Sequence, residues 1–321
     1  MLKRLLPLGH VAAVNESELS VTFKNESRIK LKGADNYDCY DDQTEILTSR
    51  GWMFMKDLPE GLPVMTLNPG TNKAELQKPL RYIHEEYGGP MYQLTSKKLD
   101  LLVTPNHKFL VDTRKGVRKF KQITKIAHQD RIPASAGWEG QDNPKYTTDI
   151  MAFLGFYLSE GCARKDPGPK KSYEITFAQT KGTKGGLKGD VRGKFVEVLN
   201  RLNVNYREQE DAIRVYEKKW WELTHKLGRA WEKRIPRDIM LLPPDKLKTL
   251  LHWMIAGDGV VKKDGMRLLY TTSLGLAGDV QELCMKIGQS AGIAEKPQTS
   301  GSLKCGRLIE PKRPLYTRKL L

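Results

Sequence analysis

Two short stretches with the same order of residue types carry the acidic groups that could do chemistry. The first is the run 153–161, FLGFYLSEG, and the second is the run 251–259, LHWMIAGDG. Each pattern predicts an apolar helix that ends in a carboxylate, Glu160 or Asp258, followed by glycine. Two copies of a helix that carries an acid at its end suggest a site with paired acids. That arrangement suits divalent metal ions and phosphodiester cleavage.

The similarity between the two stretches continues downstream. The residues EGCARKD at 160–166 match DGVVKKD at 258–264, and the β-rich run ITFAQT at 175–180 matches LLYTTS at 268–273. One supersecondary unit therefore occurs twice in the chain. Either stretch alone is most simply a buried helix with a glycine C-cap, and it is the duplication that favours the paired-acid interpretation.

These residues resemble the two motifs of LAGLIDADG (DOD-type) homing endonucleases. In that family the paired helices pack at the domain centre, and their terminal acids hold the metal ions used to cut DNA. The resemblance implies that Glu160 and Asp258 are the metal ligands and catalytic acids, with Mg²⁺ as the expected ion and Mn²⁺ as a substitute. The small residue usual at the third motif position is Gly155 in the first copy and Trp253 in the second. Close approach of the second helix is therefore expected to rely on residues 256–257.

The segment before the second motif contains a further candidate catalytic residue. Lys233-Arg-Ile-Pro236 resembles the family block that supplies a lysine near the metals. The resemblance implies that Lys233 stabilises the charge that develops on the phosphate. Two alternatives remain open: a plain helix-to-loop boundary set by Pro236, or Arg234 in place of the lysine.

The rest of the duplicated region is expected to form α-β-β-α units. Strands are expected at 173–180, 212–219 and 268–273, helices at 191–202, around 220–228 and 278–292, and a closing strand in the tail 306–321. Cys284 lies at helical spacing with apolar neighbours and is expected in the core. Two such units would build a curved sheet that forms a saddle for a DNA duplex, with alternate side chains facing the grooves. A pseudo-symmetric monomer is expected.

The charge of the chain is strongly positive. Among 321 residues the net charge is +16, with a sequence pI near 9.5 and 39% apolar residues. Basic residues gather just after the first motif, at Lys165, Lys170, Lys171, Lys181, Lys184, Lys188, Arg192 and Lys194. A basic surface beside paired acids favours double-stranded DNA as the partner over a surface that is merely solubilising.

Four cysteines, at 39, 162, 284 and 305, are widely spaced and form no CxxC pair, so neither a zinc site nor a disulfide framework is indicated. A reducing, cytoplasmic setting fits this usage, in a phage or prokaryotic host cell. No apolar run reaches the roughly 18–20 residues of a membrane helix. The start of the chain is interrupted by Pro7 and His10 and shows no targeting signal.

A second candidate site begins at Cys39. From there the residue pattern predicts short strands joined by turns, and this β-rich pattern continues to about residue 135. The run CYDDQTEILT from Cys39 and the block LLVTPNHKFLV resemble the N-terminal half of the Hint fold of inteins. The resemblance implies that Cys39 attacks the carbonyl of Asp38 to form a thioester, that His107 assists through the scissile amide nitrogen, and that Thr104 orients that bond. A small buried cysteine and a plain turn are the structural alternatives.

Residues 1–38 precede this nucleophile. ELSVTFKNESRIKLKGADNYD predicts a β-hairpin, and its last part resembles a piece of phage terminase large subunits, in which a serine typically stands where this chain has Cys39. Residues 1–38 are therefore interpreted as a fragment of an interrupted host protein, an N-extein. No GxxxxGK[ST] phosphate loop occurs, so the chain is not expected to be a packaging motor.

The expected fold class is α+β, with an incomplete all-β Hint-like module followed by a duplicated αββα LAGLIDADG endonuclease domain. The expected divisions are 1–38 for the host fragment, 39–135 for the Hint module and 146–321 for the nuclease. The asparagine and histidine that end an intein are not expected here, because the last asparagine is Asn205 and the last histidine is His252. Splicing would then need a C-terminal intein piece supplied in trans.

The leading interpretation is an intein-encoded homing endonuclease that makes double-strand cuts in the intein-less host gene. Two alternatives are a degenerate intein that retains only DNA binding, and a nucleic-acid-binding module that uses the same duplicated fold. Loss of cutting with retained binding in Glu160→Gln and Asp258→Asn would distinguish an enzyme from a binder.

Overall fold

The structure is a computed structural model. It describes residues 11–15, 20–24, 28–30, 38–96, 99–165, 173–180, 189–296, 301–302, 308–309 and 315–320. By packing, the chain divides into two units, one of residues 1–41, 83–94 and 101–132, the other of residues 42–82, 95–100 and 133–321. This division follows contacts within the fold and does not test the expected domains 1–38, 39–135 and 146–321, which remain predictions.

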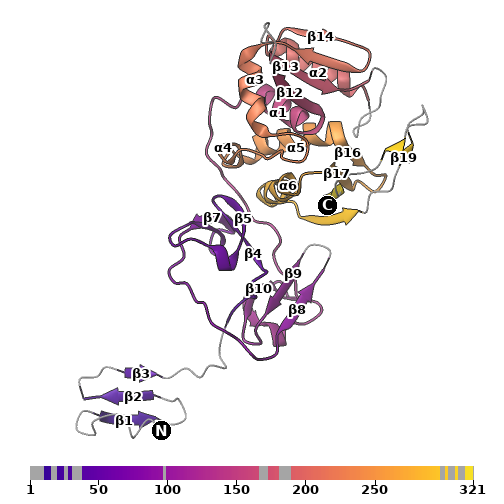
Figure 1. Cartoon of the computed structure of the whole chain (residues 1–321). Helices are drawn as coiled ribbons and strands as arrows, with labels where there is room; N and C mark the ends of the chain where they lie inside the picture. The colour runs from indigo at the N-terminus through magenta and orange to yellow at the C-terminus, as the bar shows by residue number, and fades with distance from the viewer. Residues whose placement is uncertain are drawn as a thin grey trace. The chain divides into compact units, whose positions relative to one another are not determined.

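The first unit consists of small antiparallel sheets (Figure 1). Its strands are β1 (Val11–Asn15), β2 (Ser20–Phe23), β3 (Arg28–Lys30), β8 (Tyr92–Thr95), β9 (Asp100–Val103), β10 (Lys108–Asp112) and β11 (Arg118–Gln122), followed by the 3-10 turn Ile123–Lys125. β2 pairs with β3, which confirms the predicted hairpin, although residues 31–37 of the terminase-like run lie outside the described residues. A small core of Val103, Phe109 and Val111 supports the turn between β9 and β10.

The second unit begins with a four-stranded antiparallel sheet in the order β5-β4-β6-β7. Its elements are β4 (Glu45–Thr48), β5 (Gly51–Phe54), the 3-10 turn Met55–Asp57, β6 (Val64–Asn68) and β7 (Lys73–Gln77). β4 and β5 form a tight hairpin in which Thr48 pairs with Gly51. Gly51 adopts a φ of +105°. This backbone conformation favours glycine, because the Cβ of any other residue would clash with the backbone.

The first acidic stretch lies at the end of α1 (Thr148–Glu160). Thr147 caps the helix by accepting a hydrogen bond from the Ile150 amide, and the chain turns into β12 at Gly161. The elements that follow are β12 (Gly161–Lys165), β13 (Tyr173–Ala178), α2 (Val191–Arg201), β14 (Tyr206–Glu208), β15 (Ala212–Val215) and α3 (Lys218–Thr224) with the 3-10 turn His225–Leu227. Their sheet has the order β12-β13-β15-β14.

The second acidic stretch repeats this arrangement. After α4 (Arg237–Met240), the chain forms α5 (Pro244–Asp258), β16 (Gly259–Val261), β17 (Arg267–Thr271), α6 (Leu274–Lys286), β18 (Ala291–Lys296), the short pair β19 (Gly301–Ser302) and β20 (Leu308–Ile309), and β21 (Leu315–Leu320). The sheet order β16-β17-β21-β18 matches that of the first sheet strand for strand, with β19 and β20 inserted. The predicted closing strand is confirmed as β21.

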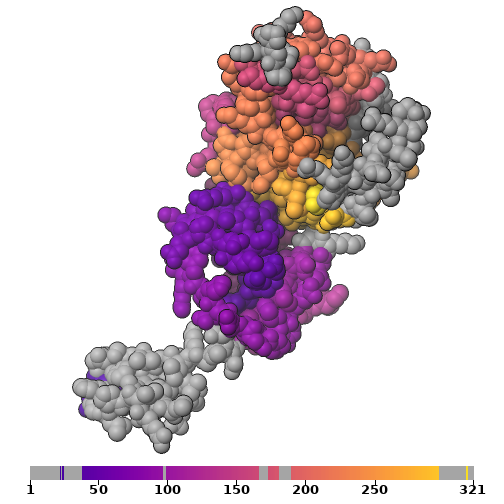
Figure 2. Space-filling model, viewed as in Figure 1, coloured from indigo at the N-terminus to yellow at the C-terminus, as the bar shows by residue number. Residues whose placement is uncertain are grey.

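One hydrophobic core joins both copies. It includes nearly all of α1, the inward residues of β13 and β15, and the buried faces of α2, α5 and α6. Because α1 is buried from Met151 to Leu158, it is apolar on every side, as expected of a helix at the centre of a domain. In Figure 2 the magenta to yellow residues of the two copies form one continuous surface. None of the helices in the described ranges is long and apolar enough to cross a membrane.

Candidate active site at the ends of two packed helices

Glycines let α1 and α5 approach closely. A Cβ on Gly155 would lie 2.9 Å from the Cβ of Trp253 and closer still to the backbone carbonyl of Leu250. A Cβ on Gly257 would lie 2.8 Å from Cγ of Glu160. The predicted dependence on Gly257 is confirmed, and Trp253 is accommodated because Gly155 opposes it. The two helix ends, and with them Glu160 and Asp258, are therefore neighbours.

The two acids share an unfavourable electrostatic environment. Burial raises the pKa of Glu160 to about 7, the charge of Asp258 adds to the rise, and the charge of Lys233 opposes it. Burial around the carboxyl group also raises the pKa of Asp258, although the residue as a whole is exposed, and Lys233 again opposes the rise. Glu160 is half-buried. Raised pKa values of paired carboxyl groups are frequent at functional sites, where a cation completes the charge balance.

Lys233 is the basic residue next to this pair. Its side chain is 4% exposed, and its Nζ donates to the carbonyls of Tyr157, at 2.8 Å, and Ser159, at 3.2 Å. Those carbonyls belong to the last turn of α1, where cations are favoured. Burial lowers the pKa of Lys233 to about 8, while the charges of Asp258 and Glu160 oppose that change.

Arg234, the alternative to Lys233, has other partners. Its guanidinium makes a bidentate ion pair with Asp279, with both N–O distances 2.8 Å. The structure therefore brings the lysine, rather than the arginine, to the acids. The same segment turns into α4 just after Pro236.

The donor set suits a hard divalent ion. Glu160 and Asp258 supply carboxylate oxygens, which Mg²⁺ and Mn²⁺ prefer. No group of three or more His, Cys, Asp or Glu side chains in the described ranges is arranged to hold a metal ion. The remaining ligands of an ion held here would have to come from water or from phosphate, as is usual for Mg²⁺.

The outer face of the first sheet is polar. Ile175, Phe177 and Ile213 point into the core, so the alternate residues of the strands face outward. Cross-strand pairing aligns an outward row that runs through β12, β13, β15 and β14, namely Cys162, Thr176, Arg214 and Arg207. Arg164 and Arg207 are exposed. The face offers a row of hydrogen-bonding and cationic groups beside the acidic pair.

Only part of the basic cluster predicted after the first motif lies at the protein surface. The prediction is wrong for Arg192, which is 5% exposed and donates to the carbonyls of Gln209, at 2.6 Å, and Ala212, at 3.2 Å. It fastens the β14–β15 turn to α2. Lys165 and Lys194 are exposed, whereas Lys170, Lys171, Lys181, Lys184 and Lys188 lie outside the described residues.

The first unit brings Cys39, Thr104 and His107 together. The amide N–H of Cys39 donates to Oγ1 of Thr104 at 3.0 Å, and the Thr104 amide donates to the carbonyl of Cys39 at 3.0 Å. The predicted place of Thr104 at the Asp38–Cys39 peptide bond agrees with this contact. Nδ1 of His107 lies 2.6 Å from the Asp38 carboxylate, and the ring packs edge-on against Tyr40 and Phe109.

The electrostatics of this second site keep Cys39 protonated at rest. Burial raises the pKa of the Cys39 thiol, and the charges of Asp38 and Glu85 add to the rise. Burial lowers the pKa of His107, although the Asp38 carboxylate opposes the change. The two shifts together disfavour transfer of the thiol proton to the imidazole in the resting protein.

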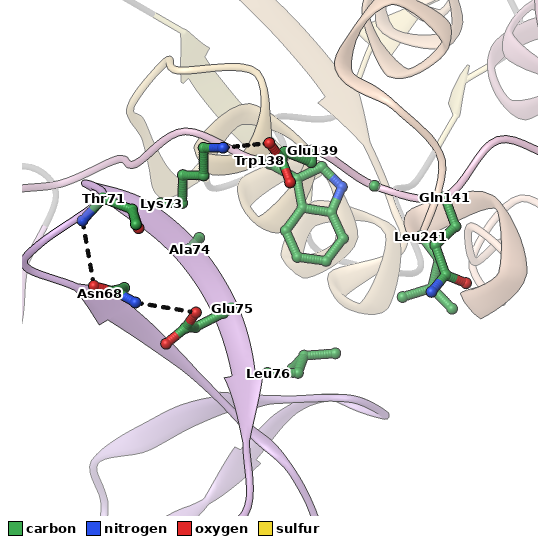
Figure 3. Close-up of a pocket in the computed structure, with 11 residues that line it drawn as sticks. Asn68, Thr71, Lys73, Ala74, Glu75, Leu76, Trp138, Glu139, Gln141 and Leu241 are labelled. Atoms are coloured by element: carbon green, nitrogen blue, oxygen red, sulfur yellow. Dashed lines mark hydrogen bonds and ion pairs between the residues drawn. The ribbon is translucent and has the colours of Figure 1, made fainter.

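A cavity of about 530 Å³ lies elsewhere, between β7 and the segment that leads to α1 (Figure 3). The indole of Trp138 stands on one wall, and Lys73 and Glu139 pair across it. Neither the acids of the paired helices nor Lys233 line it. This cavity is therefore distinct from the candidate active site.

The sequence did not reveal several charged residues around Lys233. Asp279 and Glu282 on α6 are 1% and 0% exposed, and each pairs with an arginine of the 233–240 segment. The predicted core position of Cys284, 0% exposed, is confirmed. Acids three residues apart on an amphipathic helix look like a solvated face, so nothing in the pattern set them apart.

No family model matches the chain. Similar curated proteins include an ATP-dependent Clp protease proteolytic subunit of Chlamydomonas moewusii, 24% identical over 80% of this chain and 28% of the relative. A ribonucleoside-diphosphate reductase subunit beta of Aquifex aeolicus is 23% identical over 64% of this chain and 31% of that protein. The replicative DNA helicase DnaB of a Nostoc strain is 25% identical over 65% of this chain and 25% of the helicase. The chain thus spans about a quarter to a third of these relatives.

Solved structures with some likeness are those of the homing endonuclease I-DmoI. One, in complex with its target DNA in the presence of Mg, covers 56% of this chain and 92% of its own, with 12% identity and a TM-score of 0.39. Another, in complex with DNA and Mn, covers 54% of this chain and 90% of its own, with 14% identity and a TM-score of 0.37.

Proposed function

We propose that this chain is an intein-encoded LAGLIDADG endonuclease that makes metal-dependent double-strand cuts in DNA. One observation carries the proposal: Glu160 and Asp258, far apart in the chain, meet at the ends of two packed helices. The buried Lys233 lies beside them. Acids from two copies of one unit and a nearby cation form the constellation that phosphodiester hydrolysis needs.

In the proposed mechanism Glu160 and Asp258 would hold Mg²⁺, or Mn²⁺ in its place, and their carboxylates would help to orient the attacking water. The bound ion would lower the pKa of water and stabilise charge on the phosphate oxygens. The Lys233 ammonium adds positive charge where the phosphate becomes more negative. Its donation to carbonyls of α1 keeps it within reach of both acids.

The two sheets are proposed to bind duplex DNA on their outward faces. The matching strand orders of the two copies support a pseudo-symmetric monomer that places one acid near each strand of the duplex. Arg164 and Arg207 on the outer face are suited to phosphate or base contacts. The substrate would be the intein-less host gene, in the cytoplasm of a prokaryotic host cell.

The similarity to unrelated enzymes supports an inserted element. The relatives are named as a protease subunit, a reductase subunit and a helicase, and this chain matches less than a third of each. A segment shared by proteins with such different activities is expected of an insertion that does not serve the activity of its host. The proposed host fragment is residues 1–38.

Residues 39–135 are proposed to be the N-terminal part of the splicing module. Sγ of Cys39 would attack the carbonyl carbon of Asp38, forming a C–S bond as the C–N bond breaks. The thiol proton ends on the freed amine, which converts the peptide bond into a thioester. The hydrogen bonds between Thr104 and Cys39 support this role because they fix the bond that must break. A C-terminal intein piece in trans would complete splicing.

The nuclease proposal is tested by cleavage of a plasmid that carries the uninterrupted host gene. With Mg²⁺ the parent chain should linearise it, while Glu160→Gln and Asp258→Asn should lose at least about a hundredfold in rate and still bind the same DNA. Asp264→Asn is the matched control, because Asp264 is an exposed acid in the turn after β16. If both site variants cut like the parent, the proposed site is wrong.

A degenerate intein that only binds DNA is the competing function. It predicts retention of the plasmid in a gel-shift measurement without any nicking in Mg²⁺ or Mn²⁺. The buried Lys233 beside two acids favours the enzyme, because charged groups with perturbed pKa values gather at catalytic sites.

A further inference from the structure

We propose that the β4–β5 hairpin is a working part of the nuclease, because it positions Lys233 through α6. This inference rests on the proposed nuclease function and names positioning residues for that same site. The hairpin belongs to the region expected to serve splicing, so the two proposed activities would share a structural element. The contacts form a chain of four steps.

In the first step, α6 holds the backbone of Lys233. Ser273 caps α6, where its Oγ accepts from the Leu276 amide at 3.1 Å and donates to the carbonyl of Lys233 at 2.8 Å. Ser273 is 1% exposed. The N-terminus of α6 therefore fixes the peptide that carries the lysine.

In the second step, an acid of α6 clamps the residues that follow. Asp279 accepts from the Arg234 guanidinium and from the amide of Ile235, each at 2.8 Å. Gly275 makes room for this pair, because a Cβ there would meet the side chain of Arg234. A buried acid with three charge-assisted or amide donors is held firmly, since leaving any of them unpaired is costly.

In the third step, the hairpin binds α6 and α4. Nε1 of Trp52 donates to the carbonyl of Gly278 on α6 at 3.2 Å. Nε of Arg237 donates to the carbonyl of Ser49 at 3.1 Å, and its other nitrogens pair with Glu282 at 2.6 and 2.8 Å. A Cβ on Gly51, at the turn, would lie 3.5 Å from a guanidinium nitrogen of Arg234.

In the fourth step, the network closes on the linker that leads to α1. Glu282 also pairs with Lys286 at 2.7 Å, and the Lys286 ammonium lies 4.3 Å from the centre of the Trp138 ring. Nε1 of Trp138 donates to the carbonyl of Leu242 at 3.1 Å. Residues of the proposed splicing module, residues of the proposed nuclease and the linker between them thus all contact α6 and hold it in one position.

The position of Lys233 follows from that of α6. A displacement of about 1 Å in a catalytic group can cost about a hundredfold in rate. Loosening the hairpin should therefore slow cleavage while DNA affinity stays nearly constant, because the outer faces of the sheets lie on other elements. Trp52 and Asp279 are positioning residues in this proposal.

The test measures how readily Lys233 is methylated by formaldehyde and a borohydride, read by peptide mass spectrometry on the full chain. Trp52→Ala and Asp279→Asn should speed modification of Lys233 at least about fivefold, because its Nζ, now buried and bonded to carbonyls of α1, becomes accessible to the reagent. Trp52→Phe is the milder variant, which removes the indole donor alone. Trp221→Phe is the matched control, since Nε1 of Trp221 has no hydrogen-bond partner among the residues that the structure describes.

A double-mutant cycle supplies the second readout. Trp52→Ala and Asp279→Asn should lower the single-turnover cleavage rate about 10- to 100-fold with less than about twofold change in DNA binding. In a Lys233→Met background they should add nothing further, because their effect passes through the lysine. Unchanged methylation of Lys233, or rate losses that add fully to that of Lys233→Met, would overturn the proposal. If the parent chain cuts no DNA, the nuclease function fails, and the methylation result still decides the positioning.

Discussion

At the scale of single residues, the acid pair determines when an ion can bind. A metal ion must compete with a proton for Glu160, whose pKa is raised to about 7, and the pKa of Asp258 is raised in the same direction. Lys233 offsets part of their repulsion, because its charge opposes the rise of both pKa values. At acidic pH the affinity of this site for a metal ion is therefore expected to be lower than that of an exposed pair of carboxylates.

Metal binding should depend on pH in a defined window. Because the pKa of Glu160 is about 7, binding of Mn²⁺ should strengthen as pH rises from 6 to 7 and level off above 8. Below the pKa the slope should approach about tenfold per pH unit. Titration calorimetry of the full chain with Mn²⁺ measures this, and Glu160→Gln should flatten the profile. A parent profile already flat from pH 5 to 8 would contradict the assigned pKa.

Cys39 offers a separate residue-scale prediction. A thiol such as dithiothreitol should release residues 1–38 from the parent chain, seen as two masses that sum to the whole. Cys39→Ala should abolish release, and Thr104→Ala should slow it about tenfold or more, because the Cys39 amide loses its hydrogen bond. Cys284→Ala, in the core of the second unit, should not affect release. Absence of release even with a C-terminal intein piece supplied would contradict an active Cys39.

At the scale of elements, the contact of α1 with α5 brings the acids together. Glycine in a helix interior costs roughly 0.5–1 kcal/mol relative to alanine, so its presence at 155 needs a compensating benefit. The benefit is the space taken by the Leu250 carbonyl and the Trp253 side chain.

Gly155→Ala should therefore destabilise the protein, against helix propensity. We expect a loss of about 1–3 kcal/mol in the free energy of unfolding, measured by urea denaturation, because the helices must move apart. Gly278→Ala on α6 is the control, since its Cβ would meet only Trp52 Cδ1 at an ordinary 3.4 Å. That change should be neutral or stabilise by up to about 1 kcal/mol. A stabilised Gly155→Ala protein would show that the close packing is absent.

The elements themselves could be predicted where their periodicity is strong. The apolar runs before Glu160 and Asp258 gave α1 and α5, and the alternation around Ile175 gave β13. The three-residue strand β14 had too short a pattern to predict. Charged residues gave the least reliable signal: Arg192 looked like surface but is buried because backbone carbonyls surround it.

At the scale of the whole molecule, the packing of the hairpin was beyond sequence reasoning. Nothing in GWMF predicts that Trp52 binds α6 across more than two hundred residues, because tertiary contacts of that kind carry no local period. Likewise, the approach of Glu160 to Asp258 was an expectation from duplication and resemblance, and only the three-dimensional structure brings the helix ends together.

The positive charge of the whole chain predicts strongly salt-dependent DNA binding. With a net charge of +16, the logarithm of the binding constant should fall linearly with the logarithm of salt, by about 0.9 per phosphate contact. Arg164→Gln and Arg207→Gln should each reduce that slope by about 1. Arg114→Gln, an exposed arginine in the β10–β11 turn, should leave it unchanged. Equal slopes for all four proteins would exclude the first sheet as a DNA-binding face.

The most direct measurement is a crystal of the full chain with duplex DNA and Mn²⁺, in which the anomalous signal locates the metal. We predict a peak within about 2.0–2.3 Å of carboxylate oxygens of both Glu160 and Asp258, lost in Asp258→Asn. A peak bound elsewhere, or a parent complex that contains DNA and no metal beside these residues, would contradict a shared metal site.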